Sequence, residues 1–172
     1  FTEGRLSLFN KRLLVNAGLR YDYFENEMLA TEGLSTDSRK EHLDQVTARG
    51  GLVYKVTNDL SLKGNVGTAF RAPAPLELAA DYMSWGTHYV GNPDLKPEKS
   101  ITYDAGIDYS KGPFKADFTY FYTDFDDKIV GYYDTVRAVS TYKNAPGATI
   151  QGVELNASFD VGAALGWPVI LE

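Results

Sequence analysis

The side chains best suited to chemistry in this sequence lie between Pro75 and Pro93. His88 provides an imidazole there, and a neutral imidazole binds iron through a ring nitrogen. Its neighbours are aromatic or contain sulfur, a composition able to cover a flat apolar macrocycle: Tyr82, Met83, Trp85 and Tyr89. The segment therefore predicts a ligand-binding surface of His88, Tyr89, Trp85 and Tyr82, and the alternative is that His88 is an ordinary exposed loop histidine.

Three carboxylates, Asp124, Asp126 and Asp127, form a second cluster with the ligand type that Ca²⁺ prefers. The spacing and the glycine of an EF-hand loop are missing, so a solvated strand end is the favoured interpretation. The sequence has no cysteine, which excludes disulfides and thiolate metal sites. We therefore predict no metal site.

Catalytic arrangements are not indicated either. Gly50 and Gly51 lie within a predicted strand rather than in a phosphate-binding loop. His42 and His88 lie in separate predicted loops, which argues against a Ser–His–Asp triad. The prediction is a protein that is not an enzyme.

The composition is that of a folded chain with neither a membrane helix nor a basic surface. Of 172 residues, 44% are hydrophobic and 13% aromatic, which is too aromatic for disorder. Lys and Arg are scattered singly and the net charge is −6, so no nucleic-acid partner is expected. No apolar run approaches the roughly 20 residues of a spanning helix. A spanning strand needs only about 9–11 residues, with every second one apolar.

Alternation with period two dominates the chain and predicts long antiparallel strands. Apolar residues recur at every second position around 13–24, 46–56, 60–66, 101–109, 114–122 and 153–159, and a first strand is expected near 3–9. We read 140–159 as one strand, kinked at 144–147 by a Pro-Gly pair. The expectation is an all-β chain with an antiparallel meander of about eight long strands.

The connections between these strands alternate between short and long. Short turns are expected at 10–12, 57–59, 110–113 and near Asp160, whereas long excursions occupy about 25–44, 70–97 and 131–137. Short turns on one rim and long loops on the other are typical of an outer-membrane β-barrel. A soluble β-sandwich also alternates, but several Tyr residues at strand ends suit the interfacial girdle of a barrel.

Four segments carry a resemblance to a known family. Residues 67–78 read GTAFRAPAPLEL and residues 91–100 read GNPDLKPEKS. Further along come YFYTDFDDKI over 120–129 and a YKN…GVE pattern from Tyr142 to Glu154. In this order and spacing, which covers about half the chain, they resemble the TonB-dependent outer-membrane receptors. The motif residues are Phe70, Arg71, Pro73, Asn92, Pro93, Leu95, Pro97, Glu98, Asn144, Gly152 and Glu154.

The resemblance implies a 22-stranded barrel, a plug domain and a segment that contacts TonB, in the outer membrane of a Gram-negative bacterium. Residues 1–172 are expected to be a segment of the barrel, with the plug and the TonB-contacting part outside it. The chain opens and closes abruptly, and Leu171-Glu172 is either native or a cloning scar. Partners would be a metal chelate and outer-membrane lipid.

The motif residues also have a reading in terms of physical chemistry. Pro73, Pro93 and Pro97 stop strands and shape the barrel rim, because proline removes a hydrogen-bond donor and fixes φ. Arg71, Glu98 and Glu154 are expected to face the polar interior, where pairing with the plug would offset their desolvation.

The two faces of the barrel follow from the alternation. Lipid-facing positions are predicted to be Leu13, Val15, Leu19, Ile101, Ile107, Phe118, Leu155 and Phe159, and lumenal ones Arg20, Lys63, Asp104 and Glu154.

The expected function is uptake of a ferric siderophore or similar chelate, with no cofactor. Haem uptake through His88 is the first alternative, since haem receptors of the family place a histidine between the same two motifs. A soluble β-sandwich adhesin and an outer-membrane phospholipase or protease are the alternatives from other classes.

Overall fold

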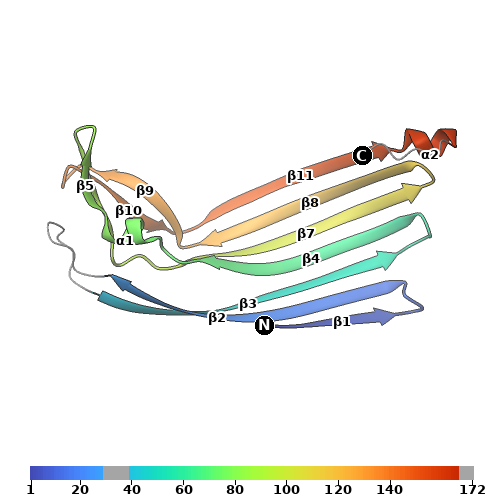
Figure 1. Ribbon diagram of the computed structural model, residues 1–172, viewed down its shortest axis with the longest axis horizontal. Coiled ribbons are helices and arrows are strands. Elements are labelled where there is room, and N and C mark those ends of the chain that lie inside the picture. The colour runs from blue at the N-terminus through green and yellow to red at the C-terminus, as the bar shows by residue number, and fades with distance from the viewer. Residues whose placement is uncertain (29–38, 167–172) are drawn as a thin grey trace.

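The computed structural model describes residues 1–28 and 39–166, and most of these residues lie in β-strands. The strands that form the main sheet are long and follow one another along the chain: β1 (Thr2–Leu8), β2 (Leu13–Met28), β3 (Arg39–Lys55), β4 (Leu60–Arg71), β7 (Glu98–Lys111), β8 (Phe114–Asp126) and β11 (Ala148–Phe159). They pair in the order β1-β2-β3-β4-β7-β8-β11, and every pair is antiparallel. Figure 1 shows this sheet as a long, gently curved wall. The predicted antiparallel meander is confirmed.

The register places the predicted lipid-facing residues on one face of this wall. Ile107 lies opposite Leu62 and Phe118, and Phe118 lies opposite Leu155. Because paired residues of an antiparallel ladder share a face, the apolar row continues from strand to strand. All eight residues predicted to face lipid have this parity, and the four predicted to face the lumen have the other.

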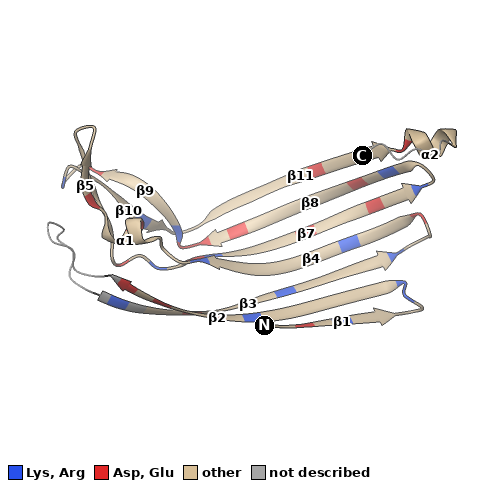
Figure 2. Cartoon of the chain, viewed as in Figure 1, with Lys and Arg blue, Asp and Glu red and all other residues tan. Residues whose placement is uncertain are grey.

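Polar side chains pair with one another on the second face. Lys63 Nζ lies 2.8 Å from Asp108 Oδ1, and Asn65 donates a hydrogen bond of 2.6 Å to Asp104. Figure 2 shows that charged positions of both signs are spread over the strands. The wall therefore has one apolar and one polar face, as a barrel strand requires.

The described part of the expected loop at 25–44 is strand. β2 continues to Met28 and β3 begins at Arg39, so Glu25 pairs with His42 and Glu27 with Lys40. His42 is therefore a strand residue rather than a loop residue. Over residues 13–24 and 46–56 apolar side chains alternate with polar ones, but charged side chains replace the apolar ones at these strand ends. The sequence pattern therefore does not indicate that β2 and β3 extend this far. The rest of that excursion lies outside the described residues.

A second, smaller sheet forms from two other excursions. Residues 70–97 contain α1 (Pro75–Ala79), β5 (Asp81–Ser84) and β6 (Thr87–Val90), not an irregular loop. The excursion predicted at 131–137 is a hairpin of β9 (Lys128–Asp134) and β10 (Val139–Ala145). The four strands pair in the order β5-β6-β10-β9, and β6 and β10 run parallel, with His88 opposite Val139. This pair departs from the predicted all-antiparallel arrangement.

The segment from 140 to 159 bends as predicted at its Pro-Gly pair, but the bend divides it between the two sheets. β10 ends at Ala145 and joins the small sheet, whereas β11 begins at Ala148 and joins the main one. The partner strand is broken at the same level, where Asp127 has a φ of 53° between β8 and β9. Eleven strands are described where about eight were expected, and the additional ones belong to the small sheet of β5, β6, β9 and β10.

Helices are minor elements of this fold. The predicted short turn near Asp160 leads into α2 (Val161–Leu165), and the Asp160 carboxylate accepts a hydrogen bond of 2.9 Å from the Ala163 amide. No helix in the described ranges is long and apolar enough to cross a membrane.

Candidate functional site

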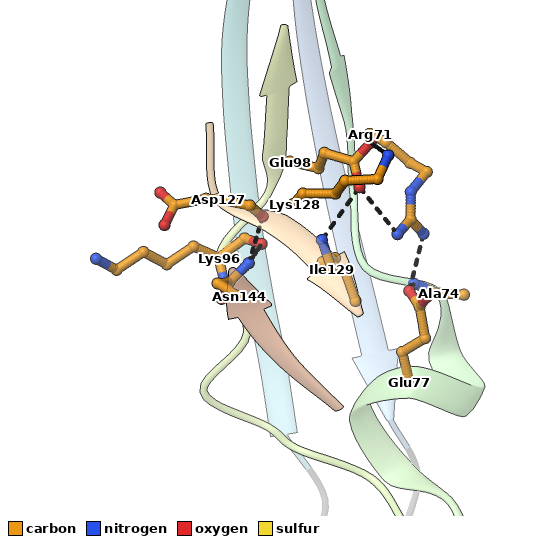
Figure 3. Close-up of polar contacts among 9 residues, drawn as sticks. All are labelled: Arg71, Ala74, Glu77, Lys96, Glu98, Asp127, Lys128, Ile129 and Asn144. Atoms are coloured by element: carbon orange, nitrogen blue, oxygen red, sulfur yellow. Dashed lines mark hydrogen bonds and ion pairs between the residues drawn. The ribbon is translucent and has the colours of Figure 1, made fainter. Parts of the chain in front are cut away.

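The four motifs, far apart in the sequence, meet where the small sheet joins the main one. Figure 3 shows the end of β4, the turn into α1, the start of β7 and the β9–β10 hairpin around a group of polar contacts. We call Arg71, Glu77, Glu98, Lys128 and Asn144, with the backbone groups they bind, the rim clamp. Only the order of the motifs, not their meeting, was visible in the sequence.

Arg71 and two glutamates form the first half of the rim clamp. Arg71 Nη1 donates to Glu77 of α1 at 2.9 Å, and Arg71 Nη2 lies 3.4 Å from Glu98 of β7 (Figure 3). Glu98 also accepts a hydrogen bond of 3.1 Å from the Ile129 amide of β9, and Lys128 Nζ lies 3.8 Å from its other oxygen. In the part of the chain described here, Arg71 and Glu98 are paired within the barrel chain, and their pairing with a plug stays a prediction.

Asn144 forms the second half of the rim clamp through a single amide side chain. Its oxygen accepts from the Lys96 amide at 2.8 Å, and its nitrogen donates to the carbonyls of Lys96 at 2.9 Å and Asp127 at 2.7 Å. Asn92 adds a similar link, since its side chain donates to the Tyr142 carbonyl at 3.0 Å. The two asparagines thus tie the 91–97 connection to the β9–β10 hairpin.

A small apolar core lies beside the rim clamp. Leu78 of α1, Leu95 and Ile129 are each less than a tenth exposed, and Tyr142 packs against them. Burial raises the pKa of the Tyr142 hydroxyl above its ordinary value. Leu95, chosen from the sequence as a motif residue, is therefore a core residue that joins the two excursions.

The other motif residues lie outside the rim clamp, in the strands or in the connections between them. Pro73 is buried at the end of β4, Pro93 is exposed, and Pro97 is partly buried just before β7. Phe70 meets Phe24 edge-on, with ring centroids 5.9 Å apart. On β11, a Cβ added to Gly152 would lie only 2.9 Å from ring atoms of Phe121, so the absence of a side chain makes room for this ring. Glu154 of the same strand makes no ion pair among the described residues.

The charge of Glu77 stabilises the turn between β4 and α1. Burial alone would raise its pKa, but hydrogen bonds from the Arg71 side chain and the Ala74 amide, with the Arg71 charge, hold it below the ordinary value of 4.5. A pKa lowered by folding stabilises the folded state above the ordinary pKa, and this stabilisation is lost as the pH falls through the folded pKa.

We therefore expect α1 to loosen in acid. Amide exchange of α1 in the full-length receptor, corrected for its intrinsic pH dependence, should accelerate as the pH falls below the ordinary glutamate pKa of 4.5 and through the lower pKa of the folded state. Glu77→Gln should remove most of this dependence, because the amide does not titrate. An unchanged pH profile in Glu77→Gln would contradict the assignment.

The β5–β6 hairpin holds the residues predicted to bind ligand, but it does not bring all of them to one face. Tyr82 and Tyr89 lie opposite each other and stack with ring centroids 5.0 Å apart. His88 lies opposite Met83 on the other face, and Trp85 is fully exposed at the turn. His88 Nε2 lies 2.7 Å from Asp81 Oδ1, and since a carboxylate only accepts, Nε2 carries the proton.

One other prediction concerns the carboxylates at the end of β8. Within the ranges 1–28 and 39–166, no three metal-binding side chains gather into a group, so Asp124, Asp126 and Asp127 form no such site there.

Cavities that sequence reasoning missed lie where β3 and β4 diverge beyond the Arg49–Gly67 pair. One of about 540 Å³ and one of about 330 Å³ are both lined by Thr47 and Thr68. No pattern in the sequence indicates where two strands separate.

Comparison with known proteins agrees with this architecture. Residues 1–171 match the family described as TonB dependent receptor-like, beta-barrel. Heme/hemopexin utilization protein C of Haemophilus influenzae is 30% identical over 90% of this chain and 24% of its own length. The ferric enterobactin receptor of Pseudomonas aeruginosa is 26% identical over 81% of the chain and 22% of its own length. The hemophore receptor HasR of Serratia marcescens superposes with a TM-score of 0.71 at 18% identity, over 90% of this chain and 30% of that one.

These matches exclude the β-sandwich alternative. They also show what share of a relative's length the chain represents. It spans about a quarter of the length of the curated relatives it matches. The family consists of transporters, which agrees with the expectation that the protein is not an enzyme. The chain belongs to the TonB-dependent receptors of the outer membrane of Gram-negative bacteria and forms part of their β-barrel.

Proposed function

We propose that the receptor containing this chain imports a ferric siderophore or a similar metal chelate, with energy from TonB. The external hairpins capture the chelate, and a plug outside this chain releases it and contacts TonB. Similarity to the ferric enterobactin receptor supports a siderophore as cargo. The ordered, stacked pair of Tyr82 and Tyr89 at the outer rim offers aromatic surface for such a ligand.

The observation that carries the choice of a siderophore over haem is the bond between His88 and Asp81. Haem ligation needs a ring nitrogen with a free lone pair, and Nε2 is protonated and held by Asp81 at 2.7 Å. The other nitrogen, Nδ1, is bonded to Cγ and is nearer than Nε2 to the point where the ring joins the backbone, which leaves less room for a macrocycle. A haem receptor would have to break this bond first.

Haem remains the second candidate because of one specific similarity. Heme/hemopexin utilization protein C matches 90% of this chain, including the segment that contains His88. In that case Asp81 would be the group that releases or orients the imidazole.

The test compares two histidines in the full-length receptor. Cells with the receptor as their sole importer are given a ferric catecholate, a ferric hydroxamate or haem, and iron uptake is measured. We expect uptake of one siderophore, unchanged by His88→Ala and by the control His42→Ala. His42 lies on β3, and its Nδ1 is 2.9 Å from the Tyr23 hydroxyl of β2. Uptake of haem that is lost in His88→Ala but kept in His42→Ala would establish the second candidate instead. Uptake of none of the three would refute both.

A further inference from the structure

We propose that Glu98 is a positioning residue that holds the small sheet, and with it both of the excursions that form this sheet, in a fixed position against the main sheet. The statement that this sheet captures ligand rests on the proposed function, but the mechanical role does not.

The small sheet is one body built from two separate excursions. β5 and β6 come from the connection between β4 and β7, and β9 and β10 from the connection between β8 and β11. The parallel pairing of His88 with Val139 and of Tyr89 with Ser140 joins them. A displacement of one excursion must therefore displace the other.

Glu98 stands where this body meets the wall. It is the first residue of β7, opposite Arg71 of β4, and its side chain is 12% exposed. Its carboxylate binds the Ile129 amide and lies near Arg71 and Lys128, so one charge links two wall strands to β9. Such a poorly solvated charge is costly to leave unpaired, which makes the geometry specific.

The link from Glu98 to the ligand-binding hairpin passes through the core. The bond from the Ile129 amide fixes the residue whose side chain packs with Leu78 and Leu95. Leu78 belongs to α1, which directly precedes β5. Arg71 adds a second route, because it binds both Glu98 and Glu77 of α1. Loss of the carboxylate therefore removes support from β9 and from α1 together.

The experiment measures amide exchange in the full-length receptor in lipid vesicles. In Glu98→Ala, we expect exchange at least about tenfold faster in β9 and β10 and also in β5 and β6, which Glu98 does not contact. Glu98→Gln should be intermediate, because the amide oxygen still accepts from Ile129 while the ion pairs are lost. The matched control is Glu154→Ala, since Glu154 lies on β11 without an ion pair among the described residues. Protection of β8 and β11 should stay unchanged in all three variants.

Several outcomes would overturn the proposal. Acceleration confined to β9 means a local structural role, and no acceleration means no role. Loss of protection throughout the barrel in both Glu98→Ala and Glu98→Gln means a fold residue. Where the receptor imports a siderophore, Glu98→Gln should raise the KM for uptake and leave the maximal rate unchanged, and a fall in the maximal rate alone would contradict positioning. Absence of siderophore uptake in the unaltered receptor refutes the proposed function and leaves the exchange result decisive for Glu98.

Discussion

Replacement of Phe118 by arginine is expected to destabilise the full-length receptor in a bilayer by about 2–4 kcal/mol. Phe118 is the middle residue of the apolar row of β8, which runs from Phe114 to Tyr122. Its neighbours across the sheet, Ile107 and Leu155, are also apolar and exposed. A guanidinium at this depth would have to lie in hydrocarbon or drag water into it. The measurement is the free energy of unfolding in lipid vesicles, from denaturant titration.

The adjacent residue provides the control. Thr119 lies on the polar face, opposite Gly106 and Glu154, so Thr119→Arg places the same charge in a hydrated lumen beside a carboxylate. We expect it to cost far less than Phe118→Arg. Equal costs for the two variants would contradict the assignment of the faces, and a larger cost for Thr119→Arg would reverse it.

The second large effect is expected at Gly91, the first residue of the 91–100 motif, which lies against α1. A Cβ there would lie 2.5 Å from the Leu78 carbonyl carbon and the Ala79 nitrogen, and 2.6 Å from the Ala80 nitrogen. These are backbone atoms, held by a hydrogen bond of 2.7 Å from the Gly91 amide to the Ala80 carbonyl. Gly91→Ala must therefore push α1 away from its core, at a cost of about 1–3 kcal/mol.

The cost at Gly91 should appear locally. We expect faster amide exchange in α1 and in β5 and β6, while the barrel keeps its resistance to denaturation by detergent. Gly4→Ala in β1 is the matched control, because a Cβ at Gly4 meets nothing within 4 Å. Unchanged exchange in Gly91→Ala would mean that α1 moves freely, and the packing described for it would then be wrong.

Prediction from the sequence succeeded where a single face had to be apolar. The alternation of Leu13, Val15 and Leu19 defines both the strand and its face, because lipid tolerates little else on that side. The same signal fails beyond Tyr23, where Glu25 and Glu27 continue the row with Lys40 and His42 opposite them. Strand pairing there continues without any need for apolar side chains, so the pattern falsely indicated a loop.

Contacts between distant segments were beyond reach for a different reason. Arg71 and Glu98 were each chosen as motif residues, but nothing in their spacing says that Arg71 and the Ile129 amide both bind the Glu98 carboxylate. The pairing of His88 with Val139 depends on which two excursions bend toward each other, and that is set by three-dimensional packing. Residue types identified the participants, and only the structure identifies their partners.

The parallel pairing of β6 with β10 has a consequence for how the chain assembles. β1 to β4 follow one another directly in the chain, as do β7 and β8, whereas β6 and β10 are separated in the chain by β7, β8 and β9. The entropy of closing so long a loop opposes that contact until β7 and β8 have already paired. We therefore expect β6 and β10 to pair only after β7 and β8 have paired, so that the small sheet is completed late in folding.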